Sequence, residues 1–118
     1  MPKRNTTAAT SAKMIQIYSE TGPQLFALQT ELRNLAKKKP DATLSKAKVA
    51  LINKVLVDIK EPFQQESGGK YLELLDDQTL PQYSDVVLII AQYATVLTQF
   101  RERYTETDEA FQSRWLVR

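Results

Sequence analysis

The sequence contains no cysteine and no histidine. The missing cysteines exclude a disulfide framework, a thiolate nucleophile and every thiolate metal site. The missing histidines remove the commonest general base and the commonest metal ligand. Glycine is scarce, and the Gly68-Gly69 pair lacks both the preceding strand and the fingerprint of a phosphate-binding loop. These absences predict a protein that is not an enzyme and that holds no metal or cofactor.

Long apolar runs are also missing. The longest, Val86 to Ala91, has six residues, whereas a membrane-spanning helix needs about 18 or more. The N-terminal residues MPKRNTTAATSAK are polar and do not form a secretion signal. We therefore expect no membrane segment and a cytoplasmic location. A length of 118 residues with 42% hydrophobic and 25% charged residues indicates one domain with a modest core.

The charges are distributed unevenly along the chain. Residues 1–60 carry 11 Lys and Arg against 4 Asp and Glu, a net +7, and residues 61–118 carry 5 against 10, a net −5. Such asymmetry permits head-to-tail pairing between protomers, or a basic face for an anionic partner. The alternative is that solvated helix faces simply differ in sign.

The stretch from Ser84 to Tyr104 has the strongest helical pattern. Its apolar residues recur at alternating steps of four and three, which places them on one face of a helix. The residues on this face are Val86, Ile90, Tyr93, Leu97, Phe100 and Tyr104. Other apolar side chains make the first half of the helix apolar almost all round, namely Val87, Leu88, Ile89, Ala91, Ala94 and Val96. A face of this breadth exceeds what two neighbouring helices cover, so we predict self-association, as a dimer.

A second helical stretch precedes Lys39, with Thr10 or Ser11 as the cap at its start. Gly22-Pro23 interrupts it, because proline removes a backbone donor and crowds the preceding turn. The apolar phase is the same on both sides of the proline. We therefore expect two helical pieces on one roughly common axis, bent at Gly22-Pro23; a clean break there is the alternative.

A third helical stretch ends near Lys60, and Asp41 or Thr43 is positioned to cap its start. Ser67-Gly68-Gly69 is the clearest loop. After this loop, KYLELLDD has the length of two helical turns, and the last residues, TETDEAFQSRWLVR, have the pattern of a short final helix or an apolar arm. Ser84 is the expected cap of the apolar helix, and Leu80 and Tyr83 are expected to fill the core from the loop before it.

Together these patterns predict an all-α fold, a small helical bundle of three long helices plus one or two short ones. Residues 1–9 are expected to be a flexible tail and residues 10–118 a single bundle domain.

Two groups of residues are candidate binding sites. The apolar and aromatic candidates for a protein partner are Tyr93, Leu97, Phe100, Tyr104, Phe111 and Trp115. The basic candidates for a polyanion are Lys37, Lys38, Lys39, Lys46 and Lys48, which flank one loop. A third group, Glu73, Asp76, Asp77 and Asp85, could hold Mg²⁺ but is better explained by helix capping and solubility.

These observations predict a non-enzymatic helical protein–protein interaction module, such as an adaptor, an assembly factor or a small structural subunit. The prediction depends on the absent catalytic residues and on the surplus of apolar helix surface. The alternative is a small accessory subunit that binds RNA or DNA through its lysine-rich edge. A carboxylate-dependent Mg²⁺ enzyme is a third and weaker hypothesis.

Overall fold

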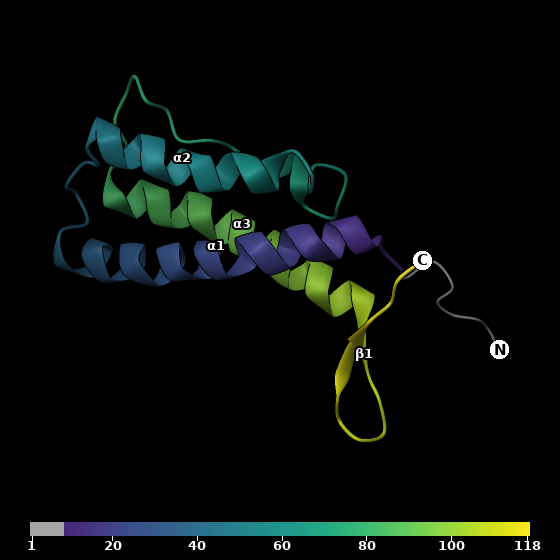
Figure 1. Ribbon diagram of the computed structural model, residues 1–118. Helices are drawn as coiled ribbons and strands as arrows, with labels where there is room; N and C mark the ends of the chain where they lie inside the picture. The colour runs from purple at the N-terminus through teal and green to yellow at the C-terminus, as the bar shows by residue number, and fades with distance from the viewer. Residues whose placement is uncertain (1–8) are drawn as a thin grey trace.

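The computed structural model describes residues 9–118. Three long helices, α1 (Ala12–Lys38), α2 (Lys46–Lys60) and α3 (Tyr83–Tyr104), form its body. They lie side by side, and a two-stranded hairpin projects from the bundle where α3 ends (Figure 1). The protein is therefore mostly helical, as predicted, with a small sheet that was not. The expected tail at residues 1–9 lies almost wholly outside the described residues and stays a prediction.

Helix α1 begins where the sequence indicates. The side chain of Ser11 accepts a hydrogen bond of 3.1 Å from the backbone N–H of Met14, so Ser11 is the cap. The helix then continues through Pro23 to Lys38 without interruption, which confirms the common axis and makes the clean break wrong. It persists because residues on both sides of the proline, Tyr18 before it and Leu25 after it, pack on the same core. The bend at this point stays a prediction.

Helix α2 begins later than predicted, because the chain before it is extended. The backbone N–H of Leu44 donates to the carbonyl of Pro81 at 2.9 Å. This pairing holds the connecting segment out of helical geometry up to Leu44. The cap is therefore Ser45, and not Asp41 or Thr43.

Helix α3 begins at Tyr83, two residues earlier than a cap at Ser84 implies, and no side chain caps it. The N–H of Tyr83 donates to the carbonyl of Ala42 at 2.9 Å, and the N–H of Ser84 donates to that of Pro40 at 3.2 Å. Carbonyl groups of the α1–α2 connection thus satisfy two of the free donors at this helix end. The predicted Ser84 cap is wrong because Ser84 lies inside the helix, where the N–H of Val86, which a Ser84 cap would accept from, already donates to the carbonyl of Gln82 at 3.1 Å.

The predicted helix over residues 70–77 is wrong. A single 3₁₀ turn, η1 (Gly69–Tyr71), follows the loop, and the chain then runs extended toward α3. Leu72 and Leu75 turn inward and are buried. Tyr83 is buried as expected, but Leu80 is exposed and does not fill the core.

The predicted C-terminal helix is also wrong. Strands β1 (Thr105–Thr107) and β2 (Ser113–Trp115) pair in antiparallel register, with Thr105 opposite Trp115. The chain then returns to the start of α1, where Val117 forms a parallel bridge with Thr10. The C-terminal segment is therefore fastened by main-chain pairing at both of its ends.

The core comprises side chains from all three helices and from the extended segment. The whole predicted face of α3 is buried: Val86, Ile90, Tyr93, Leu97, Phe100 and Tyr104. The chain's own core does not cover the rest of the helix surface. Leu88 is 69% exposed, and Val87, Ile89 and Ala91 are only partly buried. The single chain therefore covers one broad face of α3 and leaves part of the opposite side in solvent.

Candidate functional site

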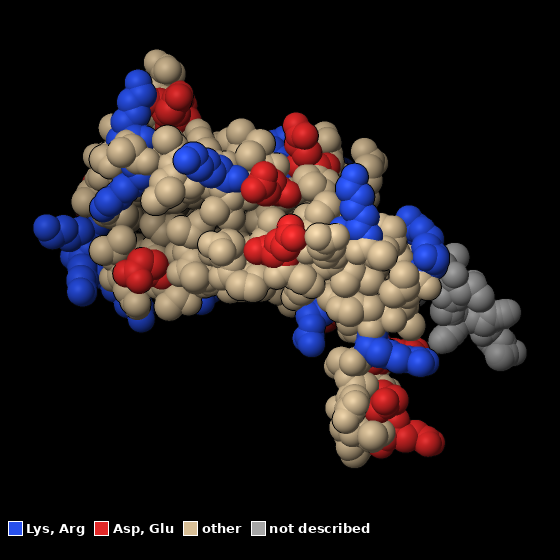
Figure 2. Space-filling view, in the orientation of Figure 1, with Lys and Arg blue, Asp and Glu red and all other residues tan. Residues whose placement is uncertain are grey.

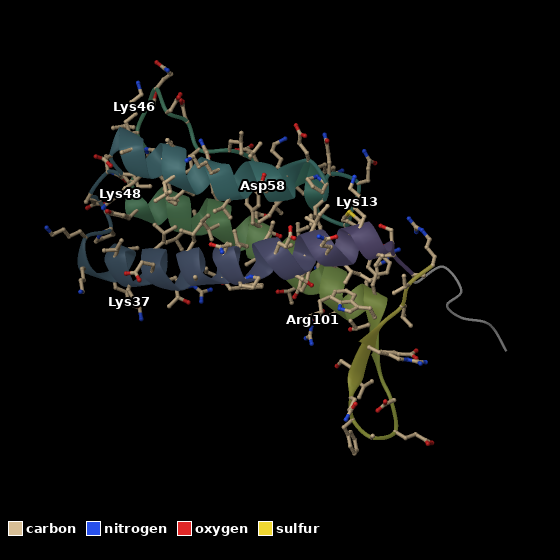
Figure 3. The ribbon with its side chains drawn as sticks, viewed as in Figure 1. Lys13, Lys37, Lys46, Lys48, Asp58 and Arg101 are labelled. Atoms are coloured by element: carbon tan, nitrogen blue, oxygen red, sulfur yellow. The ribbon has the colours of Figure 1, made fainter. Side chains whose placement is uncertain are left out.

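The structure brings the five candidate lysines together at one end of the bundle. Lys37, Lys38 and Lys39 end α1, and Lys46 and Lys48 lie in the first turns of α2 (Figure 3). All five are exposed, and within residues 9–118 no carboxylate lies within ion-pair distance of their ammonium groups. Figure 2 shows blue side chains gathered at this end. Their convergence produces a positive surface, here called the lysine edge.

One lysine of this edge is partly held by the protein. The ammonium group of Lys48 donates to the hydroxyl of Tyr83 at 3.2 Å and lies 5.9 Å from the centre of the Tyr83 ring. A cation over an aromatic face is attracted by the ring electrons. Lys48 is therefore positioned at the start of α3, which fixes one point of the edge.

The predicted protein-binding residues separate into buried and exposed groups. Tyr93, Leu97, Phe100 and Tyr104 are at most 9% exposed and belong to the chain's own core. Phe111, in contrast, is 89% exposed at the tip of the hairpin. The sequence pattern alone did not distinguish an apolar residue that packs within the chain from one that remains available to a partner.

Trp115, the remaining candidate, joins an aromatic cluster around Phe100. The ring centre of Phe100 lies 5.0 Å from those of Phe63 and Tyr104, 5.7 Å from that of Trp115 and 5.8 Å from that of Tyr18. Edge-to-face and stacked contacts at these distances are favourable. The cluster fastens the hairpin to the bundle, so Trp115 has a structural role in this chain.

The candidate carboxylates Glu73, Asp76 and Asp77 lie in the segment between η1 and α3, and Asp85 lies in the first turn of α3. Within residues 9–118, no three carboxylates are grouped so that they could hold an ion. The side chain of Asp76 instead accepts a hydrogen bond of 2.8 Å from the N–H of Gln78, which closes a turn. At Asp76, the structure thus supports a local capping role for the carboxylate.

Asn53 explains why the same segment is extended, and the sequence pattern did not identify it. Its amide nitrogen donates to the carbonyl of Leu75 at 3.0 Å, and its oxygen accepts from the N–H of Leu75 at 2.9 Å. The side chain thus replaces the partner strand that Leu75 would otherwise need. The sequence feature that could have identified Asn53 is an asparagine inside a helical stretch, where the intrinsic helix propensity of asparagine is unfavourable.

Tyr93 makes a second polar contact to this segment. Its ring is fully buried, and its hydroxyl donates to the carbonyl of Glu73 at 2.7 Å. Burial raises the pKa of Tyr93 well above its ordinary value, and the nearby carboxylate of Glu73 raises it further. The neutral hydroxyl therefore remains a hydrogen-bond donor throughout the ordinary pH range.

We predict that Asn53→Ala lowers the free energy of unfolding by about 2–3 kcal/mol, because two hydrogen bonds are lost and both main-chain groups of Leu75 lose their partner. Urea denaturation measures this loss. Asn34→Ala is the matched control, since Asn34 is exposed on α1; its effect is expected to stay within about 0.5 kcal/mol. Equal effects of the two substitutions would contradict a special role for Asn53.

A shallow hollow lies between α3 and the chain that runs from the last residue of η1 onward. It has a volume of about 310 Å³, and its lining residues are Tyr71, Glu73, Leu88, Ile89 and Gln92. Tyr71 is 62% exposed and Leu88 is 69% exposed, so two of its large side chains present apolar surface to solvent. We call this region the Tyr71–Leu88 hollow.

A wider groove separates α1 from α2. It has a volume of about 490 Å³, and it is lined by Ile17, Glu20, Thr21, Gln24, Val55, Val57, Asp58, Glu61 and Pro62. Carboxylates from both helices border it, and Asp58 on α2 is labelled in Figure 3. Its lining mixes apolar residues with polar and acidic ones.

Comparison with known proteins gives no family to which the chain can be assigned. No family model, curated protein or solved structure matches it. No helix within residues 9–118 combines the length and apolarity that a membrane crossing requires. The functional argument therefore depends on the surfaces of this chain.

Proposed function

We propose that this protein is a non-enzymatic helical interaction module, an adaptor, assembly factor or small structural subunit, that self-associates as a dimer. The observation that carries the proposal is the Tyr71–Leu88 hollow, where large apolar side chains of two segments are exposed next to each other. Apolar surface gathered in one place is typical of a protein-binding site, whereas isolated exposed apolar residues are ordinary. The buried face of α3 serves the chain's own core, so this hollow replaces it as the proposed contact surface.

Light scattering coupled to gel filtration tests self-association. At tens of micromolar, we expect the wild-type protein to elute with twice its chain mass of 13.5 kDa. Leu88→Glu places a charge in the hollow and is expected to yield the single-chain mass. Leu51→Glu is the matched control, because Leu51 is similarly exposed, at 62%, but lies on α2. A wild-type protein with the single-chain mass would refute the dimer.

The lysine edge supports a second function, the binding of RNA or DNA as a small accessory subunit. The observation in its favour is the convergence of lysines from α1 and α2 at one end of the bundle. Nucleic-acid binding needs positive charge on one face, because each phosphate contact releases counterions. Arginine and exposed aromatic side chains are scarce there, so binding through the backbone phosphates is the mode that fits.

We predict that Lys37→Glu combined with Lys46→Glu abolishes binding to a labelled single-stranded RNA in an electrophoretic shift assay. The matched control reverses Lys13 and Arg101, which lie toward the other end of the bundle (Figure 3). This control changes the net charge equally but leaves the lysine edge intact. Wild-type affinity should also fall steeply as salt rises. Equal loss in both variants, or no wild-type binding at low salt, would retire this function.

A further inference from the structure

Hydrogen bonds to Asp108 close the tip of the hairpin that follows α3. The N–H of Asp108 donates to the carbonyl of Gln112 at 3.0 Å, and its carboxylate accepts from the N–H groups of Ala110 and Gln112, both at 2.9 Å. The N–H of Phe111 donates to the carbonyl of Asp108 at 3.0 Å. One aspartate thus fixes the whole turn.

Phe111 is held in a conformation that phenylalanine rarely adopts. Its φ is 62°, in the left-handed region, and it is the non-glycine residue with positive φ within the described chain. Its side chain is 89% exposed and therefore gains almost no burial within the chain. A bulky aromatic side chain held in a strained backbone position and directed into solvent indicates a function outside the chain's own core.

The hairpin cannot place Phe111 in the hollow of its own chain. Leu88 lies in the second turn of α3, whereas the hairpin follows Tyr104 at the other end of that helix. Leu88 and Tyr104 are separated by about 24 Å along the helix, at about 1.5 Å per residue. The hairpin beyond Tyr104 projects away from the bundle (Figure 1). Any contact between the two features must therefore join two molecules.

We infer that Phe111 at the hairpin tip of one copy inserts into the Tyr71–Leu88 hollow of a second copy, and that the exchange is reciprocal. This inference rests on the proposed self-association and names its contact. In a two-fold dimer, each contact occurs twice with the roles exchanged, so two hairpins would fill two hollows. An aromatic anchor in a hollow is the arrangement that contributes most to protein–protein affinity.

Size and charge favour a second copy as the occupant. The hollow, at about 310 Å³, has room for a phenylalanine side chain. The tip carries the carboxylates of Asp108 and Glu109, while the ammonium group of Lys70 lies 5.2 Å from the Tyr71 ring at the hollow. Glu73 also lines the hollow and opposes an acidic tip, so Lys70 is the group that offsets it. Figure 2 shows red side chains on the projecting hairpin.

Sedimentation equilibrium on three exposed-site variants tests the contact. Phe111→Ala removes the anchor, Leu88→Glu disables the hollow, and Leu51→Glu is the control outside both. We expect the first two to raise the dimer dissociation constant at least about thirtyfold, the size of an interface hot spot, and the control to change it less than about threefold. Unchanged circular dichroism and thermal midpoints establish that the variants are folded.

A mixture of the two disabled variants distinguishes reciprocal insertion from other dimers. The Phe111→Ala chain retains a working hollow, and the Leu88→Glu chain retains a working hairpin. One intact contact can form only between unlike chains, so the mixture should associate more tightly than either variant does alone. A wild-type monomer would refute the proposed dimer itself. A dimer that is insensitive to Phe111→Ala, or a mixture that is not restored, overturns the insertion but leaves the proposed dimer standing.

Discussion

Replacing Gly69 with alanine is expected to lower the free energy of unfolding by about 4 kcal/mol or more, among the largest effects of a single substitution. A Cβ atom at this position would lie 1.9 Å from the carbonyl oxygen of Phe63 and 2.7 Å from that of Gln64. Both obstacles are main-chain atoms, so no side-chain rotation relieves the clash. The N–H of Gly69 also donates to the carbonyl of Glu66 at 2.8 Å, which closes the turn between these two residues.

The consequence of this substitution extends beyond the turn. The chain between α2 and η1 closes tightly here, and its position directs the extended segment that reaches Leu75. Opening the turn therefore also displaces residues that line the Tyr71–Leu88 hollow. We expect Gly69→Ala to weaken self-association as well as folding, measured by chemical denaturation and by light scattering.

Gly22→Ala is the matched control, because it adds the same methyl group to a different glycine. The nearest atoms to its Cβ are on the side chains of Phe26 and Tyr18, at 3.9 Å, an ordinary contact distance. Gly22 lies inside α1, where alanine is favoured over glycine by about 0.5–1 kcal/mol. Gly22→Ala should therefore stabilise the protein slightly. A Gly69→Ala protein within about 1 kcal/mol of the wild type would contradict the steric argument.

The helices were predictable where periodic burial determines them. The alternating steps of four and three from Val86 to Tyr104 identified the buried face of α3, because one broad stripe packs on one core. The cap of α1 at Ser11 was among the two expected, since it depends only on neighbouring residues. Local sequence therefore determined these features.

The extended segments were not predictable, because their partners are distant in the sequence. Leu75 is held by Asn53 and Leu44 by Pro81, and neither pairing leaves a periodic trace. The segment KYLELLDD has good local helix formers, yet tertiary hydrogen bonds override that preference. The C-terminal residues similarly form a hairpin, because Thr10 and the aromatic cluster hold the returning chain.

The candidate sites differ in the same way. The lysine edge was foreseen because its residues flank one short connection between helices, and the structure brings them together. The Tyr71–Leu88 hollow was not foreseen, because it joins segments that were assigned to separate helices. Phe111 was a candidate from the sequence and stays one, but its left-handed conformation was not predictable.

Phe100→Ala is expected to lower the free energy of unfolding by about 3–5 kcal/mol, the usual cost of removing a fully buried aromatic side chain. Phe100 is 2% exposed and lies at the centre of the aromatic cluster, in contact with α1, the turn after α2 and the hairpin. The substitution leaves a cavity that several rigid rings cannot fill together. Urea denaturation measures the loss.

Phe111→Ala is the matched control, because it removes the same atoms from a side chain that is 89% exposed. Its effect on the free energy of unfolding should stay within about 0.5 kcal/mol, measured at concentrations where the protein is monomeric, since association adds apparent stability. The two substitutions should thus have different effects: Phe100→Ala destabilises the fold, and Phe111→Ala affects only the association of copies. Equal destabilisation by both substitutions would mean that the hairpin tip packs on the bundle, and Phe111 would then be unavailable to a second copy.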